Sequence, residues 1–190
     1  MAANIPKKAL IILAPGAEEM ETVISTDVLR RANIAVTLAG LDGKDPVTCS
    51  RQVVLVPDTS LDDAMSCGPY DVILLPGGLG GAKRLGESEK VKKVLAEQEA
   101  KGSLIAAVCA APTSLVAHGV AKGKQLTSYP SLKQRIVDGG HAYSEARVCK
   151  DGTVITSRGP GTCFEFALAV VEALVGSQVA KEIGDAMLIK

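Results

Sequence analysis

The sequence lacks tryptophan, and aromatic residues make up only 3% of its 190 residues. It also lacks an excess of charge of either sign, because 21 lysines and arginines balance 21 aspartates and glutamates. A nucleic-acid surface needs a basic face, and single strands need aromatic side chains on which bases can stack. We therefore expect no dedicated nucleic-acid surface, and few side chains that could stack on a flavin ring.

Long hydrophobic runs are absent, and cysteines are few. No apolar stretch approaches ~18 residues, so we expect no membrane span. The N-terminal segment MAANIPKK is too short and too polar for a secretory signal. The five cysteines are odd in number and widely spaced, without the CxxC or Cys/His spacing of a structural zinc site. This pattern favours free thiols in a reducing, cytoplasmic compartment, and we predict no metal site.

Apolar segments alternate with amphipathic ones along the chain. We predict buried strands at residues 9–14, 34–39, 70–75 and 104–108. Helices are predicted at about 18–32, 88–100, 112–118, 164–174 and from 178 onwards. A short hairpin at 47–56, a helical turn at 61–65 and later strands at 125–128, 142–149 and 153–157 complete the pattern. This alternation predicts one α/β domain over residues 1–190, with a mostly parallel sheet covered on both faces.

Cys109 stands where a strand is expected to turn into a helix. The apolar run Leu104–Val108 precedes it, and Ala110, Ala111 and Pro112 follow. A side chain at such an elbow lies at the carboxyl edge of the sheet, where the first amides of the next helix lower a thiol pKa. One interpretation is a buried structural cysteine, because free cysteines are often interior. The elbow favours the other interpretation, a reactive thiolate.

Two further loops follow strands of the same predicted sheet. Three glutamates crowd residues 18–21 after the first strand, and the glycine-rich PGGLGG covers residues 76–81 after the strand at 70–75. Taken alone, the carboxylates complement a helix dipole, and the glycines form a tight turn without Walker or GxGxxG spacing. Loops at the carboxyl ends of parallel strands meet at one edge, so both are expected beside Cys109. Amides of the glycine loop would there form an oxyanion hole.

The sequence offers the cysteine few histidine partners. His118 lies roughly 13 Å along the same predicted helix, too far to act as its base. His141 follows two glycines in a loop whose position the pattern does not predict. A carboxyl group from residues 18–21 is the better candidate. Repulsion from a thiolate would keep it protonated, ready to donate a hydrogen bond to sulfur and to act as general acid or base.

Four motifs, in this order along the chain, resemble one known family. They are GAEEMET at 16–22, LPGGLGG at 75–81, LIAAVCAAPT at 104–113 and TSRGPGT at 156–162. The chain resembles the Parkinson-disease-associated protein deglycase family, the DJ-1 branch of the ThiJ/PfpI superfamily, over essentially its whole length. The resemblance implies a flavodoxin-like three-layer sandwich, a homodimer and no required organic cofactor. It also implies mitochondrial or nuclear pools beside the cytoplasmic one.

The resemblance assigns roles to particular residues. The family's nucleophile matches Cys109, and its protonated glutamate matches Glu21. The amides that bind substrate and stabilise the oxyanion match Gly77, Gly78 and Ala110.

Glu18, Arg51 and Tyr129 are weaker candidates for the same site. Many relatives have histidine where Tyr129 stands in TSYP, so a proton carrier is lost there, although a phenol still hydrogen-bonds. The resemblance also implies that the first helix packs against the same helix of a second subunit. The residues that this places near a dimer seam are Met20, Asp27, Arg31 and Arg51.

The resemblance implies a glutathione-independent glyoxalase or deglycase that protects against oxidative stress. Its substrates would be methylglyoxal and related 2-oxoaldehydes, or their early adducts on proteins and nucleotides. Cys109 would add to the aldehyde carbon, the Gly78 and Ala110 amides would hold the oxygen, and water would release a hydroxy acid after Glu21 shuttles the proton. The alternative is a redox-sensing, chaperone-like protein whose Cys109 oxidises to a sulfinate.

Overall fold

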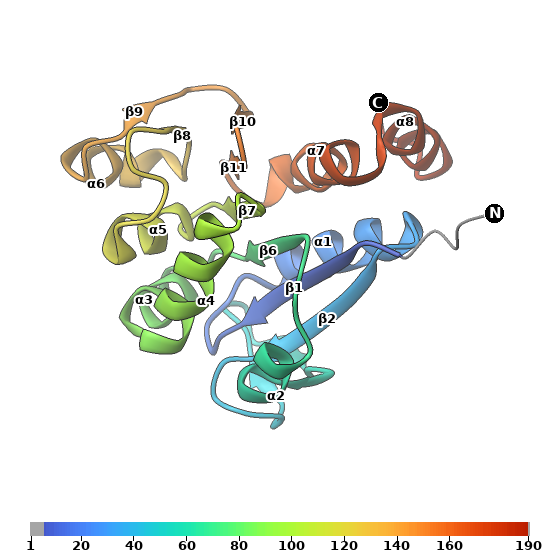
Figure 1. The fold of residues 1–190 in the computed structure, drawn as a ribbon, viewed down its shortest axis with the longest axis horizontal. Coiled ribbons are helices and arrows are strands. Elements are labelled where there is room, and N and C mark those ends of the chain that lie inside the picture. Colours follow the sequence, from blue (N-terminus) through green and yellow to red (C-terminus); the bar gives the residue numbers. More distant parts are fainter. Residues whose placement is uncertain (1–5, 190) are drawn as a thin grey trace.

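The apolar segments of the sequence form the centre of a seven-stranded sheet. The computed structural model describes residues 6–189, and in this part of the chain the strand order is β10-β11-β7-β6-β1-β2-β5 (Figure 1). Every neighbouring pair is parallel except β10 and β11. The strands are β1 (Lys8–Leu13), β2 (Ala35–Gly40), β5 (Thr59–Ser60), β6 (Val72–Leu75), β7 (Leu104–Val108), β10 (Val148–Asp151) and β11 (Val154–Ser157). The prediction of a mostly parallel sheet is confirmed.

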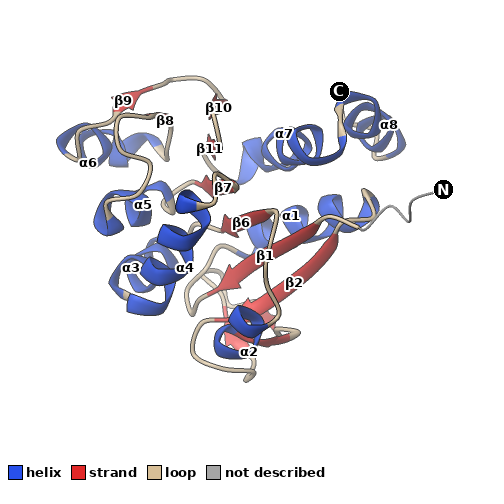
Figure 2. Cartoon of the chain, viewed as in Figure 1, coloured by secondary structure: helices blue, strands red, loops and turns tan. Residues whose placement is uncertain are grey.

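Helices cover both faces of the sheet, as Figure 2 shows. Successive strand residues point to opposite faces, so Ile11 belongs to the same hydrophobic cluster as Phe166, while Leu10 belongs to a second cluster with Leu95. The first layer contains α1 (Glu19–Arg31), α7 (Cys163–Val175) and α8 (Ser177–Ala186). The second contains α2 (Leu61–Ser66), α4 (Glu89–Ala100), α5 (Pro112–His118) and α6 (Lys133–Asp138). Among the described residues, no helix is both long and apolar enough to cross a bilayer.

Helix α3 (Leu79–Glu87) was not predicted from the sequence. Its three glycines lower helix propensity, which makes the segment resemble a loop. Tertiary contacts explain the glycines, because a Cβ on Gly81 would stand only 2.8 Å from the Ala17 Cα atom. The Gly81 N–H also donates to the Gly16 carbonyl at 3.1 Å. Close packing against the loop after β1 therefore requires glycine in this helix.

The smaller elements agree with the sequence only in part. The predicted hairpin is present as β3 (Val47–Thr48) and β4 (Val54–Leu55). The predicted strand at 142–149 is wrong, since β9 (Ala142–Tyr143) pairs with β8 (Gln125–Leu126) and a separate strand, β10, begins at Val148. Ser144 accepts a hydrogen bond from the Ala146 N–H, which turns the chain between the two strands. The short helices η1 (Pro130–Leu132), η2 (Pro160–Thr162) and α6 were also not predicted.

Three central strands end at the same edge of the sheet. In the register, Ile11 of β1 lies beside Leu74 of β6, and Leu75 of β6 lies beside Ala107 of β7. The loops that follow these strands therefore meet, as expected for parallel strands. This edge holds the candidate site.

Candidate active site

Cys109 occupies a strained elbow between β7 and α5. Its φ is 62°, in the left-handed region that non-glycine residues rarely adopt and that costs of order 1–3 kcal/mol. Two backbone hydrogen bonds hold this conformation: the Cys109 N–H donates to the Ser157 carbonyl at 3.0 Å, and its carbonyl accepts from the Tyr129 N–H at 2.8 Å. Pro112 begins α5 without losing an N–H bond. The thiol is thus presented at the end of the sheet.

Glu21 is fully buried in the first turn of α1 beside this thiol. Its Oε2 atom accepts a hydrogen bond from the Gly77 N–H at 2.7 Å. Burial disfavours the charged carboxylate and, outweighing the bonds from Gly77 and Cys109, raises the pKa of Glu21 to about 7. Its Oε1 atom is buried without a partner of good hydrogen-bond geometry among the described residues. A carboxyl group with a pKa near neutral pH can both accept and donate a proton under physiological conditions.

The expected lowering of the Cys109 pKa is wrong for this arrangement. Burial of the thiol, which is 9% exposed, together with the charge of Glu21 raises the pKa of Cys109 to about 12. The Gly78 and Ala110 amides donate toward the sulfur and lower the pKa, as the elbow argument predicts, but they do not outweigh desolvation. Burial therefore favours the protonated form of both groups, and of the two Glu21 is the more readily ionised.

The two glycines after β6 have different positions and different contacts. A Cβ on Gly77 would stand 2.6 Å from the Cys109 Cβ atom and 2.7 Å from Glu21 Oε2, so only glycine fits there. Because its N–H donates to Glu21, Gly77 holds the carboxyl group and does not present a donor to a substrate. Gly78 has a φ of 81° and precedes α3, and its N–H is directed at the sulfur with that of Ala110.

An open pocket of about 870 Å³ gives access to the thiol. Of the weaker candidates, Glu18, Arg51 and Tyr129 all line it. Glu18 caps α1 by accepting the Glu21 N–H at 2.8 Å, and Tyr129 is half-exposed. The remaining lining residues are Gly16, Met20, Thr48, Cys49, Ser50, Gln52, Gly78, Leu79, Gly80, Cys109, Ala110 and Pro160.

Glu19 is a supporting residue whose role the sequence did not reveal. It is buried and accepts hydrogen bonds from the Ser50 hydroxyl at 2.9 Å and from the Arg51 N–H at 2.8 Å. Burial acts to raise its pKa, but these and other hydrogen bonds to the carboxylate lower the pKa of Glu19 overall. Its charge thereby fixes the loop that forms one wall of the pocket. No local signal in the sequence distinguishes it from the neighbouring glutamates.

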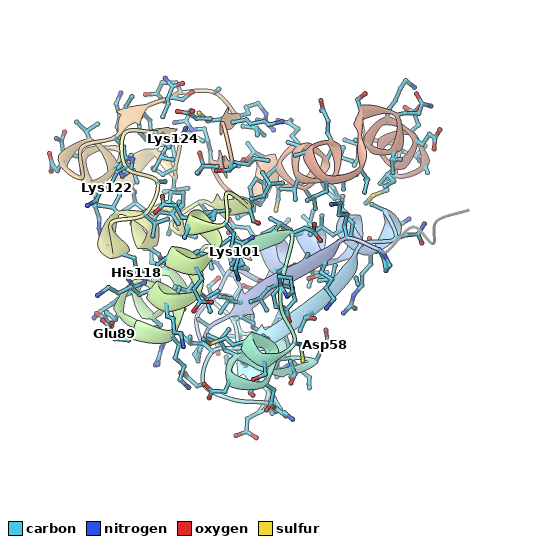
Figure 3. The ribbon with its side chains drawn as sticks, viewed as in Figure 1. Asp58, Glu89, Lys101, His118, Lys122 and Lys124 are labelled. Atoms are coloured by element: carbon cyan, nitrogen blue, oxygen red, sulfur yellow. The ribbon has the colours of Figure 1, made fainter. Side chains whose placement is uncertain are left out.

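Neither histidine of the chain belongs to this site. His118 is the last residue of α5 (Figure 3), and its Nε2 atom lies 2.8 Å from the carbonyl of Leu85 in α3. The Nδ1 atom of His141 lies 3.2 Å from the Lys124 carbonyl. Neither residue lines the pocket. Within residues 6–189 no group of three or more histidine, cysteine, aspartate or glutamate side chains is arranged to hold a metal ion.

Comparisons with known proteins found a family model and several relatives similar to this chain. A family model described as the DJ-1/PfpI family matches residues 7–173. The chain is 60% identical over 185 residues to the "Parkinson disease protein 7 homolog" of Danio rerio, covering 97% of this chain and 98% of that protein. It is 41% identical over 173 residues to the "Glutathione-independent glyoxalase DJR-1.2" of Caenorhabditis elegans, covering 90% and 91% respectively. The crystal structure of Drosophila melanogaster DJ-1beta superposes with a TM-score of 0.95 at 54% identity, covering 98% and 100%.

Proposed function

The chain belongs to the DJ-1/PfpI family, and from this premise we propose that it is a cysteine-dependent glyoxalase that needs no glutathione. The observation that carries the proposal is that Cys109 lines one open pocket together with Gly78 and Ala110, whose amides are directed at its sulfur, while the buried Glu21 carboxyl group contacts the thiol from behind. A relative that is 41% identical bears the name of a glutathione-independent glyoxalase. The substrates are 2-oxoaldehydes such as methylglyoxal, either free or as early adducts on proteins and nucleotides.

The first step joins the thiol to the aldehyde carbon. The Cys109 sulfur attacks, a C–S bond forms, and the carbonyl electron pair moves to oxygen, where the Gly78 and Ala110 amides stabilise the charge. The thiol proton goes to the Glu21 carboxylate, which then delivers it to the new alkoxide to complete a hemithioacetal. A carboxyl group with a pKa of about 7 is suited to both transfers at neutral pH.

The second step moves hydrogen within the substrate. Glu21 removes the proton from the former aldehyde carbon and returns a proton to the neighbouring carbon through an enediol. The aldehyde carbon is oxidised to a thioester while the ketone carbon is reduced to an alcohol, so no external oxidant or reductant is needed. Water then cleaves the C–S bond, the thiol regains its proton, and a 2-hydroxy acid such as lactate leaves.

Purified protein should convert methylglyoxal to lactate without glutathione, as measured by proton NMR. Replacing Cys109 by serine removes the nucleophile, so turnover should be lost. The matched control is Cys67→Ser, because Cys67 is exposed and lies outside the pocket. Undiminished turnover of methylglyoxal by Cys109→Ser would contradict the proposed mechanism.

The same surroundings of Cys109 support a second candidate, a redox sensor. Oxygens of a sulfinate on Cys109 would accept hydrogen bonds from the Gly78 and Ala110 amides and from protonated Glu21. Mild peroxide should therefore oxidise Cys109 to a sulfinate detectable by peptide mass spectrometry. Oxidation confined to the exposed Cys67 would count against this role.

A homodimer built on α1 is the assembly that the family membership favours. Met20 and Val23 are 53% and 48% exposed on this helix, although both are apolar. Asp27 and Arg31 form an ion pair at 3.0 Å on the same helix. Sedimentation equilibrium should give twice the mass of the chain, and Val23→Asp should lower it to that of one chain.

A further inference from the structure

Part of the pocket lining is apolar and has no task in the mechanism above. Leu79 is 71% exposed and Tyr129 is 46% exposed, and both line the pocket that contains Cys109. Exposed leucine and tyrosine side chains at a pocket that holds a nucleophile offer apolar surface that a ligand can cover.

The backbone of Leu79 is held by hydrogen bonds, while its side chain belongs to none of the hydrophobic core clusters. Leu79 is the first residue of α3 and directly follows Gly78, whose amide is directed at the sulfur. The chain is held on both sides of this residue, since the Glu18 N–H donates to the Gly77 carbonyl at 3.0 Å and the Gly81 N–H donates to the Gly16 carbonyl at 3.1 Å. Helix α3 buries Gly81, Ala82 and Leu85 instead. The Leu79 side chain therefore stands beside the reacting centre without a structural task in the described part of the chain.

Tyr129 is likewise fixed relative to the nucleophile. Its N–H donates to the Cys109 carbonyl at 2.8 Å. A Cβ built on Gly159 would lie 3.7 Å from Tyr129 Cδ2, which places the ring against the loop that leads to Pro160. Pro160 lines the same pocket. Leu79, Tyr129 and Pro160 thus contribute apolar surface to the pocket from three separate segments.

We propose that Leu79 and Tyr129 contact the substituent on the ketone carbon and make the enzyme prefer 2-oxoaldehydes with an aromatic or branched aliphatic substituent over methylglyoxal. The inference rests on the proposed glyoxalase function. The substituent is one carbon away from the aldehyde carbon that the sulfur attacks, so it lies within reach of a residue adjacent to Gly78. Covering the two exposed side chains removes apolar surface from water, which strengthens binding for larger apolar groups and adds little for a methyl group.

The test compares kcat/KM for phenylglyoxal with kcat/KM for methylglyoxal. In the unmodified protein the ratio should exceed one. Leu79→Gln should lower this ratio about tenfold, the discrimination typical of one apolar contact, mainly by raising KM for phenylglyoxal. Leu79→Met keeps the apolar contact and should preserve the ratio. Val137→Gln changes an apolar residue of α6 that is 43% exposed and outside the pocket, and it should also leave the ratio unchanged.

The outcomes separate this inference from the function on which it rests. If both substrates are turned over but neither Leu79→Gln nor Tyr129→Gln alters the ratio, the apolar subsite is overturned. The proposed glyoxalase function is unaffected by that result. Absence of turnover with either substrate overturns both. A change in sedimentation mass caused by Leu79→Gln would assign the side chain to a protein interface and overturn the subsite as well.

Discussion

Burial of Glu21 makes the stability of this fold depend on pH. Its pKa rises from 4.5 to about 7 on folding, so between these values the folded protein holds a proton that the unfolded chain has released. The stability contributed by protonated Glu21 is present in full below pH 4.5, the pKa of this group in the unfolded chain. That stability is lost as the pH rises through about 7, the pKa of Glu21 in the folded protein. Replacing Glu21 by glutamine removes this dependence, while an amide oxygen still accepts the Gly77 N–H bond.

The size of the effect follows from the pKa change. At about 1.4 kcal/mol for each pKa unit, ionising Glu21 costs about 3 kcal/mol more in the folded protein than in the unfolded chain. Roughly 2.5 kcal/mol of this cost falls between pH 5 and pH 8.5, because Glu21 is almost wholly protonated in the fold at the lower pH and ionised at the higher. The other titrating groups are common to both proteins and largely cancel in the comparison.

Urea unfolding of both proteins at pH 5 and pH 8.5 measures this difference. Relative to the unmodified protein, Glu21→Gln should gain about 2–3 kcal/mol of unfolding free energy on going from the lower to the higher pH. Glu87→Gln, which removes an exposed carboxylate on α3, is the control and should follow the unmodified protein. Parallel pH profiles for Glu21→Gln and the unmodified protein would refute the reasoning, because they would mean that Glu21 titrates normally in the fold.

Three further predictions follow from the site and the core. Glu21→Gln should lower the pKa of Cys109, because the carboxylate charge is one cause of its rise; alkylation rates measured against pH report this, and an unchanged midpoint contradicts it. Gly77→Ala should abolish activity and destabilise the fold because its Cβ meets Cys109 and Glu21, whereas Gly80→Ala, whose nearest contact is 3.5 Å, should keep both. Phe166→Ala should cost about 3–5 kcal/mol of unfolding free energy in urea titrations, since the ring is fully buried, and a loss below 1 kcal/mol would contradict that packing.

The central sheet was predictable because its signal is local. Runs such as Leu104–Val108 carry no charge and are short, which is typical of strands buried on both faces. Once the strands are parallel, the loops after them must meet, so the sequence alone placed Cys109 near the glutamates of residues 18–21 and near Gly78. Helix α3 escaped prediction because its glycines serve contacts with Gly16 and Ala17, which lie far away in the sequence.

The sequence by itself thus determined the sheet, the elbow and the identity of the residues gathered there. Only the tertiary structure decided the protonation of the site, because a pKa depends on how completely a group is withdrawn from water and on charges brought near by folding. The elbow amides act on Cys109 as the sequence indicated, yet burial and the charge of Glu21 outweigh them. Only the tertiary structure showed that the exposed side chain of Leu79 lines the pocket. The other lining residues come from segments that are distant in the chain and leave no periodic pattern in the sequence.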